Sequence, residues 1–320
     1  MTPALPRFAK VRHFEALVVW SGAMAFRDIL LAVLVAAIWG FNFVVIKEGL
    51  DAFPPLLFSG LRFLFAAFPA VFFLRRGSLG WSTLLKVGLV LGAVKYALLY
   101  LGVKAGVPAG LSSLVLQSQV IFTTVLSAYL LKDSPSPWQR VGMGVALLGM
   151  VLIATTRQGD VSGLGLALVI AAAVAWAFAN ILIKKASADT FKLMVWMSVV
   201  PPLPLFVLSF LFEDGQTEAL SRLMTVKGAG AVLYTGLMAT ILAFGIWGHL
   251  MRKYSPNMVA PFSLLVPLFG MACSSMVLAE RLSPVAMGAA LLVFAGLVLI
   301  VLGRRPLRLP SPASVPLIKG

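Results

Sequence analysis

Ten continuous apolar runs, each about 20 residues long, constrain the fold of this chain more than any other feature. A helix of about 20 apolar residues crosses the hydrocarbon core of a bilayer, whereas strands of a membrane barrel alternate polar and apolar residues. We therefore expect an all-α membrane protein with ten transmembrane helices. The predicted spans are Ile29–Ile46, Pro54–Leu74, Leu84–Val103, Pro108–Leu131, Pro137–Thr155, Leu164–Ile183, Leu193–Phe212, Gly228–Met251, Met258–Ala279 and Pro284–Leu302.

The composition excludes several classes of soluble protein. Of the 320 residues, 60% are hydrophobic and 12% are charged, whereas a soluble domain has about 25% charged residues. Too little polar surface remains to cover a soluble globule, so we exclude a cytosolic enzyme and a disordered chain. Cys273 is the single cysteine, which excludes an intrachain disulfide and a CxxC metal site. We expect no metal, no cofactor and no catalytic residue.

The basic residues predict an orientation. The chain has 26 Lys and Arg against 11 Asp and Glu, a net charge of +15. In a soluble protein this excess would suggest nucleic acid as a partner. Here most basic residues flank the apolar runs on one side of the membrane, so the positive-inside rule explains them without nucleic acid. We expect both termini on the cytoplasmic side.

The segment Met1–Ala23 fits none of the spans. Its basic residues come first, but Glu15 and the short apolar stretch Leu17–Trp20 make a poor signal peptide. We expect a dispensable tail or an upstream start codon, and an amphipathic surface helix is the alternative.

Two parts of the sequence resemble each other. Trp39-Gly40-Phe41-Asn42 leads to Lys47, and Trp176-Ala177-Phe178-Ala179-Asn180 leads to Lys184, with eight residues from Trp to Lys in both copies. The stretch from Pro108 to Lys132 likewise resembles Pro256 to Glu280 at equal spacing. The chain therefore divides into five spans and five spans.

An odd number of spans in each half means that the second half enters the membrane from the opposite side. We expect two inverted five-helix repeats, 28–155 and 161–303, between cytoplasmic tails 1–27 and 304–320. Inverted repeats are typical of secondary transporters, which bind their substrate near the midplane between the halves.

The first-half motif resembles the EamA family of the drug/metabolite transporter superfamily, over about residues 28–303. Three further stretches are similar to those of family members that export O-acetylserine and cysteine. The resemblance implies a bacterial inner-membrane transporter that exports small amino-acid-like metabolites, with a zwitterionic substrate and the lipid bilayer as partners. The residues that carry it are Trp39-Gly40-Phe41-Asn42-Phe43, Lys47, Pro54-Pro55, Leu61-Arg62-Phe63, Pro108–Gln117, Gly245–Gly248, Ala260–Pro267 and Ala279–Leu282.

The chain departs from the family pattern at two places. Leu131-Lys132-Asp133-Ser134 stands where the family usually has Gly-Glu-Arg, and Lys95 is a charge inside span three. Lys95 therefore leaves the cargo open: another metabolite or drug class, or amino acids such as threonine and aromatic ones, are alternatives. A membrane enzyme would need a metal cluster, an Asp pair or a Ser-His arrangement, none of which the spans contain.

Two charged residues lie deep inside spans, where a charge costs about 2.5–3.5 kcal/mol on insertion scales. Lys95 is near the middle of span three and could anchor a substrate carboxylate or bind backbone carbonyls. Arg62 lies about eight residues inside span two, as a cation in the outer vestibule or as a structural residue that binds carbonyls. Glu280, beside Arg281 at a turn, is expected to be structural.

The other candidates for a substrate cavity are polar or aromatic residues that share helix faces. Packing between helices is the alternative for each of them. In span four, Gln119 points away from Gln117, so we expect only one polar stripe there, the one with Ser113, to line the path. Oligomeric state is left open. These candidates are Trp39, Asn42, Tyr96, Ser113, Gln117, Trp176 and Asn180.

Overall fold

A computed structural model describes residues 24–68, 70–130, 132, 134–155, 162–186, 188–254, 256–281 and 283–303. The regular structure of these residues is helical throughout, without a strand. Eight helical segments among them are long and apolar enough to cross a membrane. The predicted class, an all-α membrane protein, is thus confirmed. The expectations for Met1–Ala23 and for the tail 304–320 lie outside the described residues.

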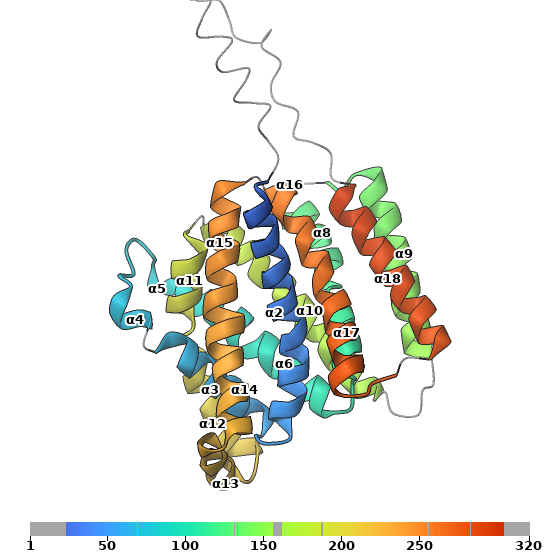
Figure 1. The fold of residues 1–320 in the computed structure, drawn as a ribbon. Coiled ribbons are helices and arrows are strands. Elements are labelled where there is room, and N and C mark those ends of the chain that lie inside the picture. Colours follow the sequence, from blue (N-terminus) through green and yellow to red (C-terminus); the bar gives the residue numbers. More distant parts are fainter. Residues whose placement is uncertain are drawn as a thin grey trace, which may run out of the picture.

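Four predicted spans are single helices, and six consist of consecutive helical pieces (Figure 1). The single helices are α2 (Phe26–Leu50), α9 (Pro137–Thr155), α10 (Gly163–Ala186) and α18 (Pro284–Leu302). Span two consists of α3 (Pro55–Ala67) and α4 (Ala70–Phe73), span three of α5 (Trp81–Val87), the π-helical η1 (Gly88–Val94) and α6 (Lys95–Lys104), and span four of α7 (Ala109–Leu116) and α8 (Gln119–Leu130). Span seven consists of α11 (Thr190–Met197) and α12 (Pro202–Phe212), and span eight of α14 (Val226–Leu233), the π-helical η3 (Tyr234–Leu242) and α15 (Ala243–Lys253). Span nine consists of α16 (Pro256–Val259), the 3₁₀-helical η4 (Ala260–Leu264) and α17 (Leu265–Val277). The short α13 (Gln216–Ser221) and η2 (Arg222–Met224) join α12 to α14.

Helices α9 and α18 lie where the fifth and tenth spans are predicted. Neither is among the eight helical segments that are long and apolar enough to cross a membrane. Each has 19 residues, and the apolar stretch of α18 is shorter, at Met287–Leu302. They pack along each other at one side of the bundle (Figure 1).

Two of the breaks inside spans have different causes. Phe68, which ends α3, is extended at φ −104° and ψ 127° because the residue after it is proline, which disfavours the helical conformation before it. Span four instead breaks at Gln117 and Ser118 without Pro or Gly. There the backbone N–H groups of both residues bond three residues back, at 3.0 Å, which tightens the turn between α7 and α8.

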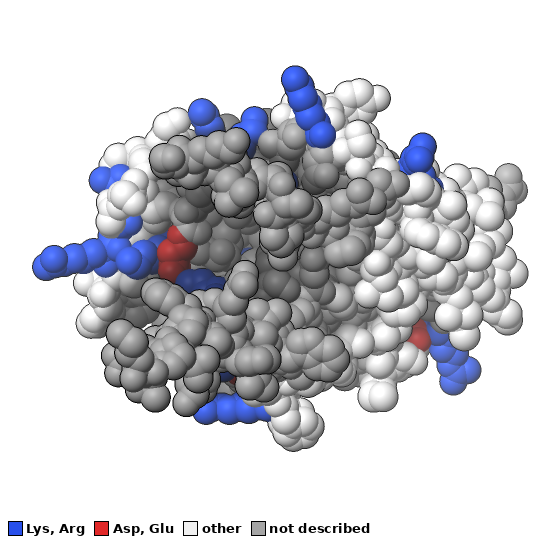
Figure 2. Space-filling view, turned by 90° about the horizontal axis from the view of Figure 1, so that it is seen from above, with Lys and Arg blue, Asp and Glu red and all other residues white. Residues whose placement is uncertain are grey.

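The two ends of the bundle differ. Helix α2 begins and α18 ends at one end, which we call the terminal end, and α13 lies at the opposite end, the far end (Figure 1). Lys and Arg side chains project around the rim of the terminal end (Figure 2). Large apolar side chains are exposed between the ends, among them Leu148 of α9 at 60% and Leu291 of α18 at 66%. This pattern is the reverse of a soluble protein's and suits contact with lipid.

Glycines allow α9 and α18 to approach closely. A Cβ atom added to Gly296 of α18 would lie 2.4 Å from the backbone nitrogen of Ala146 and 2.6 Å from the carbonyl oxygen of Gly142, both in α9. Any side chain at Gly296 therefore forces the two backbones apart. Gly288, in the same helix, has open space at the corresponding place.

We predict that Gly296→Ala destabilises the protein, because overpacking a tight contact costs about 1–3 kcal/mol. Gly288→Ala is the matched control and should leave stability equal or slightly higher. Thermal unfolding in detergent, followed by tryptophan fluorescence, measures both variants. Equal melting temperatures for Gly296→Ala and the unaltered chain would contradict the described packing.

Candidate functional site

A cavity of about 440 Å³ lies between helices of the two halves. Its volume is within the range of about 300–1,000 Å³ that is usual for small-molecule sites. All nine side chains that the sequence suggested for a cavity line this one. They are Trp39, Asn42, Arg62, Lys95, Tyr96, Ser113, Gln117, Trp176 and Asn180.

Lys95 places a positive charge at the cavity wall. It is the first residue of α6, directly after the π-helical η1, and its side chain is 3% exposed. Its Nζ lies 3.4 Å from the ring centre of Tyr96 and 4.7 Å from that of Trp176. Aromatic faces stabilise a cation through the ring quadrupole. None of the described residues that line the cavity is acidic, so no lining carboxylate neutralises this charge.

Arg62, the second cation, is held by hydroxyl groups on all sides. Its Nε and Nη2 donate to Thr240 Oγ1 at 3.2 and 3.0 Å, Nη2 also donates to Tyr96 Oη at 3.0 Å, and Nη1 donates to Tyr100 Oη at 3.2 Å. The guanidinium carbon lies 4.1 Å from the Tyr96 ring centre. Most of its donors are therefore used within the protein. The expected carbonyl partners are replaced by hydroxyls, and Arg62 ties α3 to α6 and η3.

The two Trp–Asn pairs behave differently. Trp39 Nε1 donates to the carbonyl oxygen of Ala239 at 2.9 Å, and the Trp39 ring packs against Phe244 and Trp247 at centroid distances of 4.9 and 5.3 Å. Asn180 Nδ2 donates to Gln119 Oε1 at 2.7 Å and to Thr123 Oγ1 at 3.1 Å. Asn42 Oδ1 is buried and has no hydrogen-bond partner.

Both polar stripes of span four line the cavity, so the expectation that only one could do so is wrong. Gln117 Nε2 donates to the carbonyl oxygen of Ser263 at 3.1 Å, while Gln119 bonds Asn180. The reason is the tightened turn at Gln117 and Ser118, which changes the angle between successive side chains from that of a continuous helix.

Sequence reasoning missed several lining residues. Phe244 and Trp247 lie on α15, where an aromatic near a span end usually belongs to the membrane interface. Thr190, Met194 and Ser263 also line the cavity. Single residues of these types carry no distinctive spacing, and only the packing of distant helices brings them together.

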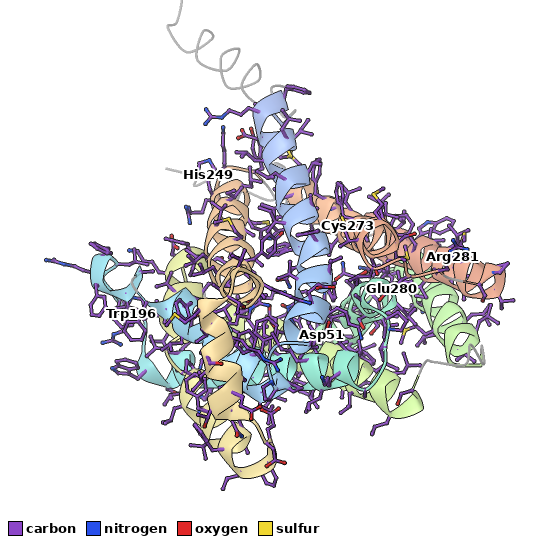
Figure 3. All side chains as sticks on the ribbon, turned by 60° about the horizontal axis from the view of Figure 1, so that its bottom comes forward. Asp51, Trp196, His249, Cys273, Glu280 and Arg281 are labelled. Atoms are coloured by element: carbon purple, nitrogen blue, oxygen red, sulfur yellow. The ribbon has the colours of Figure 1, made fainter. Side chains whose placement is uncertain are left out.

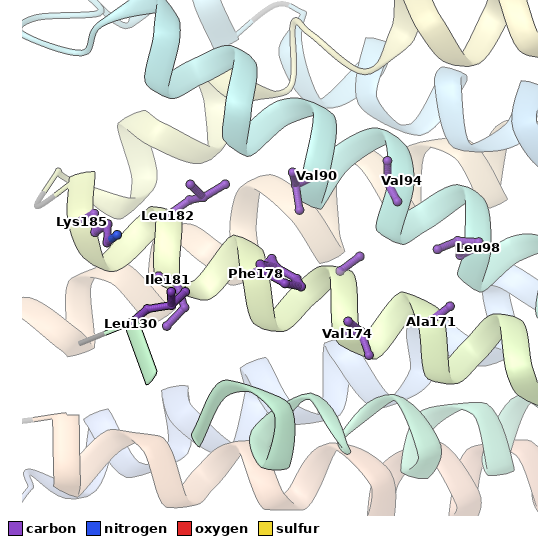
Figure 4. Close-up of a pocket in the computed structure, with 11 residues that line it drawn as sticks. Val90, Val94, Leu98, Leu130, Ala171, Val174, Phe178, Ile181, Leu182 and Lys185 are labelled. Carbon is purple, nitrogen blue, oxygen red and sulfur yellow. The ribbon is translucent and has the colours of Figure 1, made fainter. Parts of the chain in front are cut away.

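A second hollow lies against α10 and is almost wholly apolar (Figure 4). It measures about 450 Å³, and Lys185 is its one charged lining residue among the described parts of the chain. A site that orients a small polar molecule needs convergent polar groups, which this hollow lacks. The central cavity is therefore the candidate site.

Carboxylates close the far end of the bundle by capping helices of the first half. Glu213, directly after α12, accepts from the backbone N–H of Leu56 at 2.7 Å and of Leu57 at 3.1 Å, in the first turn of α3. Ser209 Oγ donates to the same carboxylate at 2.7 Å. The unpaired N–H groups at a helix N-terminus and the helix dipole both favour such a negative charge.

Glu280 caps the N-terminus of α7 in the same way. It accepts from the backbone N–H of Ala109 at 2.8 Å and of Gly110 at 3.0 Å, and Ser274 Oγ donates to it. Figure 3 marks Glu280 beside Arg281, between the end of α17 and the start of α18. The role is structural, but the partner is α7 of the other half.

The terminal end differs at the position equivalent to Glu280. By the equal spacing from Pro108 and from Pro256, this position is Lys132, whose side chain is exposed. A lysine side chain cannot accept a hydrogen bond from a helix N-terminus. The first repeat therefore has a donor at the position where the second repeat has the acceptor Glu280.

We predict that Glu280→Gln speeds amide exchange at Ala109 and Gly110 about tenfold, because a hydrogen bond to a charged group contributes about 1.5–3 kcal/mol. Hydrogen–deuterium exchange of the peptide that contains these residues measures the effect. Glu218→Gln, at an exposed acid of α13, is the control and should leave the rate unchanged. Unchanged exchange in Glu280→Gln would show that this carboxylate does not hold α7.

Comparison with known proteins shows that this chain is similar to membrane transporters. The EamA-like transporter family matches the chain twice, over residues 27–155 and 163–302. A probable amino-acid metabolite efflux pump of Salmonella typhimurium is 41% identical over 291 residues, which cover 88% of this chain and 97% of that protein. The protein of the same name in Escherichia coli K12 is 39% identical over the same coverage.

More distant proteins resemble the chain in sequence or in fold. The uncharacterized inner membrane transporter YedA of Escherichia coli K12 is 27% identical, over 83% of this chain and 88% of that protein. A crystal structure of another protein superposes with a TM-score of 0.61 at 17% identity, over 86% of this chain and 96% of the other. The chain is a multi-pass membrane protein that belongs to the EamA-like transporter family, a family of transporters and not of enzymes.

Proposed function

We propose that this protein exports small amino-acid-like metabolites, of the O-acetylserine and cysteine type, across a bacterial inner membrane. The observation that carries the proposal is Lys95, a buried cation at the wall of a cavity whose described lining contains no carboxylate. A substrate carboxylate would supply the missing negative charge. The two relatives from Salmonella typhimurium and Escherichia coli K12, each named a probable amino-acid metabolite efflux pump, agree with this class.

The cavity lining disfavours cationic drugs as cargo. Lys95 and Arg62 both carry positive charge at the cavity, and a cationic substrate would meet them without an acidic partner. Charges of like sign at short range in a medium of low dielectric repel strongly. Among the alternatives, other amino acids such as threonine or phenylalanine share the carboxylate and are therefore tested beside cysteine.

We infer that transport proceeds by alternating access between the halves 28–155 and 161–303. Glu213 and Glu280 connect the halves at the far end, while the cavity extends toward the terminal end, to Thr190 and Met251. The basic residues around the terminal end favour a cytoplasmic position for it and for both termini. In that orientation we infer that the described arrangement faces the cytoplasm.

We predict that Lys95→Met lowers release of labelled cysteine and O-acetylserine from loaded proteoliposomes at least about tenfold, since a hydrogen bond to a charged group contributes about 1.5–3 kcal/mol. Threonine and phenylalanine are measured in parallel, with and without a pH gradient. Lys86→Met is the matched control, because Lys86 is an exposed lysine of the same predicted span, and it should transport normally.

Each outcome of this experiment has a separate meaning. Release that Lys95→Met leaves unchanged would retain the function and remove Lys95 as the carboxylate anchor. Release of phenylalanine or threonine in preference to cysteine would move the cargo to other amino acids. No release of any amino acid by the unaltered protein would overturn the proposed function.

A further inference from the structure

Most polar side chains of the cavity already have partners within the protein. Arg62 bonds three hydroxyl-bearing side chains, and Asn180 bonds Gln119 and Thr123. Asn42 is an exception, with a residue exposure of 6% and an Oδ1 atom without a hydrogen bond. An unpaired buried acceptor is costly, so a partner that arrives with a ligand would bind favourably.

The other buried polar atoms without partners do not belong to the cavity. They are the Oγ atoms of Ser59, Ser112 and Ser118, none of which lines it in the described parts of the chain. A serine hydroxyl can rotate and donate to a carbonyl of the preceding helical turn. A carboxamide oxygen can only accept, so Asn42 Oδ1 requires a donor from outside the existing network.

The surroundings of Asn42 suit a positively charged donor. Trp39 precedes Asn42 by three residues on α2 and therefore shares its helix face. Its indole Nε1 is taken by the carbonyl oxygen of Ala239, and its ring, packed against Phe244 and Trp247, forms an aromatic part of the cavity wall. An acceptor oxygen beside an aromatic face is a favourable environment for an ammonium group.

We propose that Asn42 Oδ1 accepts a hydrogen bond from the amino group of the substrate, so that the cavity selects zwitterions over plain carboxylates. The inference rests on the proposed function, in which Lys95 holds the carboxylate. Asn42 and Lys95 lie on α2 and α6, which pack directly against each other. Helix α6 thus offers the cation Lys95 to the carboxylate of an amino acid. Helix α2 offers the unpaired acceptor Asn42 Oδ1 to its ammonium group.

The test compares cysteine with 3-mercaptopropionate, which is cysteine without its amino group. Initial rates of release from proteoliposomes are measured for the unaltered protein, Asn42→Leu, Asn42→Asp and Asn180→Leu. We expect Asn42→Leu to lower cysteine release about tenfold and to leave 3-mercaptopropionate unchanged, which removes the preference for cysteine. Asn42→Asp keeps an acceptor at this place and should retain the preference.

Asn180→Leu serves as the matched control. It removes an amide of the same cavity whose partners are within the protein, so it should lower release of both compounds by the same factor. If Asn42→Leu does not fold, Asn42→Asp still decides the question. If the Asn42 amide instead donated to the substrate carboxylate, Asn42→Asp would place two carboxylates next to each other, and cysteine release would be lost.

The possible failures are distinct. Equal losses of both compounds in Asn42→Leu, or loss of cysteine release in Asn42→Asp, would overturn the assignment of Asn42 and leave export intact. Release of neither compound by the unaltered protein would overturn the proposed function and this inference together.

Discussion

The central constraint on this fold is that two cations are buried in an apolar bundle without a carboxylate beside them in the described cavity lining. Moving a charge out of water is costly unless other groups replace the lost hydration. For Arg62 that replacement is hydrogen bonds to hydroxyls on two other helical elements, and for Lys95 it is aromatic faces. Tyr96 contacts both cations, so its position links the two arrangements.

Several local features of the bundle are arranged around these charges. The π-helical η1 ends where Lys95 begins α6, and η3 carries Thr240, the hydroxyl that receives two bonds from Arg62. π-Helical turns are rare and occur mostly at functional sites. Leu91 of η1 lines the cavity, and η3 leads directly into α15, whose Phe244 and Trp247 line it, so irregular helical turns lie next to the site.

The sequence predicted which residues line the cavity better than it predicted their contacts with distant helices. Charge at membrane depth identified Lys95 and Arg62, and polar residues at helical spacing identified the other seven, because these signals are local along the chain. That the nine bind substrate stays a prediction. The break at Gln117 has no Pro or Gly to announce it, so the two stripes of span four could not be placed together. The partners of Glu280 lie about 170 residues away, beyond the reach of any local pattern.

The capping carboxylates also bear on how the protein is made. Glu213 and Glu280 both belong to the second half, while the helix N-termini they cap, those of α3 and α7, belong to the first. Synthesis proceeds from the N-terminus, so α3 and α7 enter the membrane before either carboxylate exists. Their first N–H groups must meanwhile stay at the polar membrane surface, where water can bond them. The caps on α3 and α7 therefore form only when α12 and α17 arrive.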